Sequence, residues 1–137
     1  MVRTKSQKFA NVVFRNVQDV AEQQDRLARK YKALCKRAGG LVRNSGLLQT
    51  LAYFKAKGQK PSEKHHEKLY KHIGGELCHR DLGILPEGSD LFDYVRKSSV
   101  PEYMYLTREV LLLLNWHKRL ADTLIEGTAD PLTEEDT

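Results

Sequence analysis

The chain has 137 residues and a formal net charge of +5, with 40% apolar and 30% charged residues. This length fits one domain, which can bury roughly 65–70% of the surface of its unfolded chain and needs no metal or disulfide to fold. The apolar run Val110–Leu114 is too short for a membrane span, the N-terminus lacks signal-peptide features, and Cys35 and Cys78 form no CxxC pattern. We therefore expect a cytoplasmic protein.

The charge is distributed unevenly along the chain. Residues 1–60 carry 14 Lys and Arg against three acids, residues 61–119 carry nine of each, and residues 120–137 carry six acids and no base. The first half therefore produces a positive field that attracts polyanions. This pattern fits a surface that contacts nucleic acid, and it also fits a solvated basic helix face.

Residues 6–38 contain no Gly or Pro and are predicted to form one long helix. Its apolar side chains recur at spacings of three and four, with Gln24 at the one missing step, which is a heptad-like stripe. The stripe consists of Ala10, Val13, Val17, Val20, Leu27, Tyr31, Leu34 and Ala38. We expect Gly39–Gly40 to end this helix.

The next two helices are predicted over residues 45–57 and 62–78. Asn44 or Ser45 would cap the first of these, and Gly58 would end it in the left-handed conformation. Gly74–Gly75 would kink or shorten the second. Their buried faces are expected to be formed by Leu47, Leu48, Leu51 and Phe54, and by Leu69, Ile73 and Leu77.

A short helix capped by Ser89 or Asp90 precedes the last helix, which is predicted over residues 101–125 with Pro101 at its first position. The last helix is apolar almost all round and reads as central and buried, with His117 as a core histidine. The predicted fold is all-α: a single-domain helical bundle of five or six helices over residues 1–127, with a long first helix and a buried Leu-rich last helix. Residues 128–137 are predicted to be a flexible acidic tail.

No motif for phosphate cradling, dinucleotide binding or nucleophilic catalysis is present in the sequence. One cluster contains metal-binding residue types: His65, His66, His72, Cys78 and His79. Its spacing matches no common structural zinc pattern, and we interpret the cluster as part of a solvated helix. We therefore expect no metal, no cofactor and no enzymatic activity. Trp116 is interpreted as a packing residue, with base stacking as the alternative.

The strongest candidate functional surface is basic and interleaved with polar side chains. It gathers Lys36, Arg37, Arg43, Asn44, Gln49, Lys55 and Lys57, with Lys118 and Arg119 from the last helix. The helix N-terminus expected at Ser45–Leu48 would add free N–H groups that favour a phosphate. Cations on helices suit contact with an RNA backbone more than readout of its sequence, and a merely solvated surface is the alternative.

Two segments resemble a known family. "LVRNSGLLQTLAYFKAKG" and "YLTREVLLLLNWHKRLADTL", together 38 of 137 residues, resemble the small subunit of the type III-B CRISPR effector, the Cmr complex. The resemblance implies a non-catalytic helical subunit that stacks in several copies. It also implies packing against the guide-carrying backbone subunit, and contact with guide and target RNA through the basic surface.

Three alternatives remain open from the sequence. The small subunit of a type III-A complex has the same helical class and role. A helical protein–protein adaptor would bind an acidic protein without RNA. A metal-dependent enzyme would use the histidine cluster.

Overall fold

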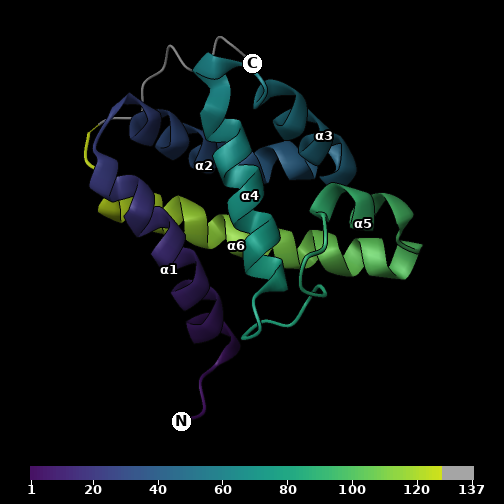
Figure 1. Ribbon diagram of the computed structural model, residues 1–137. Helices are drawn as coiled ribbons and strands as arrows, with labels where there is room; N and C mark the ends of the chain where they lie inside the picture. The colour runs from purple at the N-terminus through teal and green to yellow at the C-terminus, as the bar shows by residue number, and fades with distance from the viewer. Residues whose placement is uncertain (128–137) are drawn as a thin grey trace.

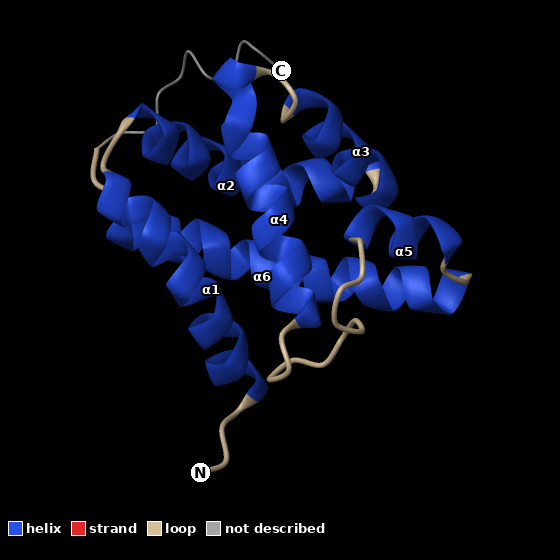
Figure 2. Cartoon of the chain, viewed as in Figure 1, coloured by secondary structure: helices blue, strands red, loops and turns tan. Residues whose placement is uncertain are grey.

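The computed structural model describes residues 1–127, which form an all-α single domain without a strand. Figure 2 shows the helices joined by loops. This confirms the predicted fold class, while the predicted acidic tail, residues 128–137, lies outside the described residues. The elements in chain order are α1 (Lys5–Gln23), α2 (Arg26–Ser45), α3 (Leu47–Lys57), the 3-10 turn η1 (Pro61–Glu63), α4 (Lys64–Cys78), α5 (Leu91–Lys97) and α6 (Val100–Leu124).

The last helix, α6, is the element around which α1 and α2 pack (Figure 1). It begins with a capping box in which Ser99 and Glu102 satisfy each other's backbone N–H groups. Leu106, Val110 and Leu113 are at most 2% exposed, so the prediction of a buried Leu-rich last helix is confirmed. Trp116 packs partly buried against the same core.

The predicted single long first helix is wrong, because the chain bends between α1 and α2. Gln24 adopts the left-handed conformation (φ 45°, ψ 38°), and Asp25 caps α2 by accepting a hydrogen bond from the N–H of Ala28. A left-handed residue with a side chain costs about 1–2 kcal/mol, and an N-cap restores about 1 kcal/mol. The bend has a physical reason: it brings the apolar faces of both helices onto α6.

The glycines act differently from the prediction. Helix α2 continues through Gly39–Gly40 and ends at Ser45. Gly46, with φ 88°, follows it and is also the N-cap of α3, in place of the expected caps Asn44 and Ser45. Gly58 is not left-handed (φ −64°); a Cβ there would lie 2.8 Å from the backbone N of Glu67, so the close approach of α3 and α4 requires glycine. Gly74–Gly75 likewise stay inside α4.

Candidate nucleic-acid interface

A basic groove, here called the α2/α6 groove, lies between α2 and α6. Lys32 and Lys36 come from α2, and Asn115, Lys118, Arg119 and Asp122 come from α6. Lys32 and Lys36 are four residues apart, and Asn115 and Asp122 each lie three and four residues from the adjacent pair Lys118 and Arg119, so each helix presents its side chains on one face. The structure therefore unites three predicted site residues, Lys36, Lys118 and Arg119, that are distant in sequence.

The cations of this groove are available to a ligand. Lys36, Lys118 and Arg119 are exposed. Within residues 1–127 none of the three forms an ion pair with an acid, although Asp122 lies in the same groove. Three cations around one concave surface produce a positive potential that attracts a phosphate backbone.

Lys32 forms one wall of the groove and has a structural role as well. Its Nζ donates to the carbonyl oxygens of Ile125 (2.9 Å) and Gly127 (2.7 Å), which ties α2 to the end of α6. Lys32, Asn115 and Asp122 were missed from the sequence. The signal that could have found Lys32 is its spacing of four residues from Lys36 on the same helix.

The other predicted residues of α2 and α3 lie outside this groove. Arg37 and Gln49 line a second groove, between α2 and α3, together with Ser45 and Tyr53. Arg43 and Asn44 are exposed in the last turn of α2, where a Cβ placed on Gly39 would lie 3.3 Å from a guanidinium nitrogen of Arg43. The predicted surface is thus divided, with Lys36 on the α6 side of α2 and Arg37 on its α3 side.

One contact occupies part of the phosphate site predicted at the N-terminus of α3. The backbone N–H of Leu48 donates to the hydroxyl of Tyr103 at 3.1 Å, so this donor is already satisfied within the protein. Tyr103 belongs to α6 and joins the start of α3 to it.

Lys55 and Lys57 are held by neighbouring groups instead of facing a groove with the other cations. The Nζ of Lys55 lies 3.8 Å from the carboxylate of Asp90, and it sits over the rings of Tyr70 and Phe92 at 5.5 and 5.3 Å. The Nζ of Lys57 lies 4.0 Å from Oε1 of Glu63, and its side chain is only 12% exposed. Both lysines therefore contribute to the packing of α3 against neighbouring elements.

Glu63, His65 and His66 form a buried cluster at the start of α4, so the interpretation of these histidines as part of a solvated helix is wrong. One ligand atom from each lies within 4.8 Å of the others, a spacing that a metal could bridge. Burial, opposed by the backbone hydrogen bond to Glu63, lowers the pKa of His66 to about 4, with Arg37, Lys57 and Lys30 adding to the effect. These three cations also oppose the binding of a divalent ion.

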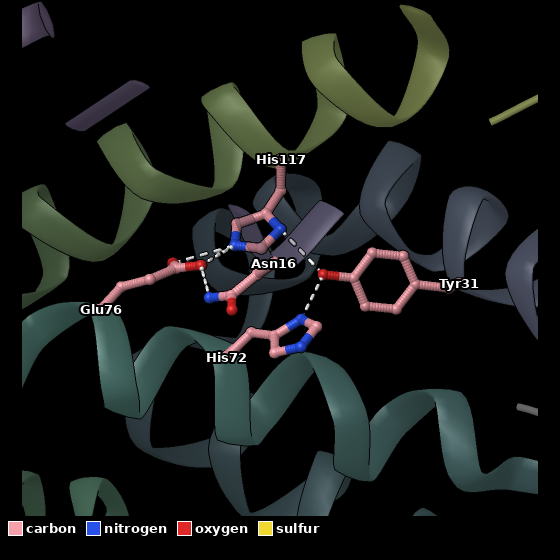
Figure 3. A network of polar contacts seen from close by, with 5 residues as sticks. All are labelled: Asn16, Tyr31, His72, Glu76 and His117. Carbon is pink, nitrogen blue, oxygen red and sulfur yellow. Dashed lines mark hydrogen bonds and ion pairs between the residues drawn. The ribbon is translucent and has the colours of Figure 1, made fainter. Parts of the chain in front are cut away.

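A second polar network joins four helices inside the bundle. Figure 3 shows His117 of α6 between Glu76 of α4 and Tyr31 of α2, with Asn16 of α1 beside Glu76. The Nε2 of His117 lies 2.8 Å from the Glu76 carboxylate, and its Nδ1 lies 3.0 Å from the Tyr31 hydroxyl. His117 is fully buried, which confirms its prediction as a core histidine.

Every contact of this network can be satisfied at the same time. His117 donates from Nε2 to Glu76, and the Tyr31 hydroxyl donates to Nδ1 of one histidine, His72 or His117, while it accepts from Nδ1–H of the other. Burial lowers the pKa of His72 to about 3, which keeps that ring neutral. Burial also raises the pKa of Tyr31 well above its ordinary value, which keeps its proton in place. The network is therefore a structural link between helices.

The described residues thus form a small helical protein whose accessible chemistry is a basic groove. Residues 5–124 match the family described as CRISPR-associated protein (Cas_Cmr5). A Thermus thermophilus protein named CRISPR system Cmr subunit Cmr5 is 33% identical over 125 residues, which cover 91% of this chain and 99% of the relative. The chain belongs to the Cmr5 family, and the resemblance to the small subunit of the Cmr complex is confirmed.

A solved structure agrees with this assignment. The crystal structure of a CRISPR-associated Cmr5 family protein from Thermus thermophilus superposes with a TM-score of 0.74 at 31% identity, and the alignment covers 90% of this chain and all of the other. The family match also covers residues 60–100, which lie between the two segments that carried the resemblance. Among residues 1–127, no helix combines the length and hydrophobicity that crossing a membrane requires.

Proposed function

We propose that this chain is a non-catalytic subunit of a type III-B CRISPR effector in the cytoplasm, where it contacts the backbone of guide and target RNA through the α2/α6 groove. The observation that carries the RNA contact is the convergence of Lys36, Lys118 and Arg119, exposed and without an acidic partner in residues 1–127. Membership of the Cmr5 family supports the assembly. The second groove, with Arg37 and Gln49, extends the contact, and Arg43 and Asn44 lie exposed on the same helix.

Affinity in this proposal comes from repetition. One copy neutralises only a few phosphates, so its isolated binding is weak and falls as salt rises. Several copies stacked along one RNA multiply the effect because each additional contact becomes intramolecular. The partners are therefore further copies of this chain, the guide-carrying backbone subunit, and both RNA strands.

An exposed apolar stripe on α6 supports packing against protein partners. Val100 is 73% exposed, Met104 63%, and Tyr105 and Leu112 41% each. These residues share one side of α6, on which exposed Arg108 lies between Met104 and Leu112, and large apolar side chains exposed on one helix side favour a protein interface. The same observation favours the second candidate function, a helical adaptor that binds protein without RNA. The small subunit of a type III-A complex remains the nearest alternative.

The test is a charge reversal in the assembled complex. Lys118→Glu with Arg119→Glu is expected to weaken target-RNA binding about tenfold or more and to reduce the salt dependence of the affinity. The matched control is Arg96→Glu with Lys97→Glu, an adjacent pair of exposed bases on α5 outside the groove. Equal affinity of the two double variants would reject the groove as an RNA site. Assembly without any role for RNA would favour the adaptor.

A further inference from the structure

The joint between α1 and α2 interrupts a segment that otherwise fits one helix. Residues 5–38 contain no Gly or Pro, and helix lies on both sides of Gln24 and Asp25. Gln24 is the only non-glycine residue with positive φ among residues 1–127. A left-handed glutamine is disfavoured, so packing of the neighbouring helices maintains this bend against the local preference of the chain.

The apolar stripe continues through the joint without a change of phase. Val17 and Val20 precede Gln24, and Leu27 and Tyr31 follow it, at alternating spacings of three and four. If Gln24 and Asp25 became helical, this stripe would lie along one face of a continuous helix over residues 5–45. Such a helix would be about 60 Å long at 1.5 Å per residue.

A straight helix would separate α1 from its own α6. In the bent form α1 packs chiefly on α6, with Phe9 and Val13 buried and the Nζ of Lys5 2.9 Å from Oε1 of Glu109. Figure 1 shows that the chain turns sharply between α1 and α2. Straightening would therefore expose two apolar faces that need cover, and the surface that fits each one is the equivalent surface on a second copy.

We infer that α1 is an exchangeable arm: in a pair of copies α1 and α2 join into one helix, and α1 of each copy docks on α6 of the other. The contacts of α1 with α6 are the same in both forms, so the equilibrium between the bent monomer and the exchanged dimer depends on the joint and on protein concentration. The straight form gains backbone hydrogen bonds across the joint and loses the Asp25 cap, a 2.9 Å bond to the Ala28 N–H. The exchange is independent of the proposed RNA contact. It would link two copies because α1 of each chain packs on the body of the other.

Two variants shift the equilibrium between the bent and the straight form in opposite directions. Arg26→Pro favours the bend, because Pro is compatible with the first position of α2 but would clash with the carbonyl of Glu22 in a continuous helix. Gln24→Ala with Asp25→Ala favours the straight form, because the cap is removed and alanine favours helix. Each full-length protein is unfolded in urea and refolded at high concentration, and its mass is then measured by size exclusion with light scattering.

We expect the double alanine variant to form at least tenfold more dimer than the wild type, and Arg26→Pro to remain monomeric. Circular dichroism checks that Arg26→Pro is folded; if it is not, Gln24→Gly replaces it, because glycine accepts the left-handed conformation. Absence of dimer in the double alanine variant overturns the inference. The inference is also overturned if Arg26→Pro, which favours the bend, dimerises as much as the double alanine variant. Dimers would then form between the surfaces of bent copies, without exchange of α1.

The intrachain distance identifies the straight helix directly. Spin labels are placed at positions 8 and 36, both exposed, in a chain with Cys35 and Cys78 replaced, and labelled chains are diluted into unlabelled ones before refolding. In a straight helix these positions are about 42 Å apart at 1.5 Å per residue. Dimers that show only the distance of the monomer reject the exchange, whichever variant forms them.

Discussion

The basic side chains of the α2/α6 groove and those around α3 and α4 belong to the same residue types and have opposite roles. Lys36, Lys118 and Arg119 are exposed and form no ion pair within residues 1–127. Lys57 lies against buried Glu63, and Lys30 donates to the backbone oxygen of Ser62 at 2.8 Å. A cation is therefore available to a polyanion only where the fold has not already given it a partner.

The largest expected effect is the loss of stability around α3 and α4 when the buried acid Glu63 is removed. Glu63→Ala is expected to lower the free energy of unfolding by about 3–5 kcal/mol, because the largely buried Lys57 and the cations near it lose their negative partner. Urea unfolding monitored by circular dichroism measures the loss. The control is Glu87→Ala, an exposed acid that forms no ion pair within residues 1–127, for which we expect less than about 0.5 kcal/mol. A small loss for Glu63→Ala would show that this acid does not hold the region together.

Lowering the pH should reduce the stability of the buried histidine cluster before it affects the α2/α6 groove. The folded pKa of His66 is about 4, and that of an unfolded histidine is about 6.5. Below pH 6.5 the unfolded chain binds a proton that the folded chain refuses, so stability falls as pH decreases toward 4. We expect a loss of up to about 2 kcal/mol between pH 6.5 and 5 from this histidine. His66→Gln should reduce the slope of stability against pH in urea titrations at several pH values, while the share of His72, whose pKa is about 3, remains. An unchanged slope would contradict the pKa of His66.

Lys55 offers a smaller test, because it was predicted to contact RNA and is found between Asp90 and two aromatic rings. Lys55→Gln is expected to destabilise the protein by about 0.5–1 kcal/mol through the lost cation–π and ionic contacts. RNA affinity of the assembled complex should remain unchanged. If affinity fell as much as in the groove variant, Lys55 would belong to the RNA surface after all.

The smallest expected effect is on the stability of the groove variants. Lys118→Ala and Arg119→Ala should each change the free energy of unfolding by less than about 0.5 kcal/mol, because these exposed side chains have no ionic partner within the described residues. Thermal unfolding measures this change. A large loss would show that these cations support the fold, and the comparison between the two regions would then fail.

The sequence predicted the class of fold well because hydrophobic periodicity and helix caps are local signals. Asp90 caps α5 and Ser99 precedes α6, close to the predicted boundaries. The bend at Gln24 was not predictable in this way, because no Gly or Pro marks it and the apolar stripe continues in phase. What favours the bend is burial of two helix faces on α6, which is a tertiary effect.

The candidate site was predictable only in part, for a related reason. Composition identified the basic residues, and the structure brings Lys36 together with Lys118 and Arg119. Composition could not separate these from Lys55 and Lys57, because the partners that hold those two lie as far as 37 residues away along the chain, from Lys55 to Phe92. Availability of a charge depends on its neighbours in space, and a single sequence does not supply them.

The network of Tyr31, Glu76 and His117 limits how the helices can slide past one another. Helices that contact each other only through Leu and Val can shift by one turn, about 5.4 Å, and still bury apolar surface. Here such a shift of α6 along α4 would separate His117 from Glu76, now 2.8 Å apart, and would leave the buried carboxylate with Asn16 as its remaining donor. An apolar replacement of all three residues could therefore keep stability while losing the single register, which would appear as broadened, multiple NMR signals from α2, α4 and α6.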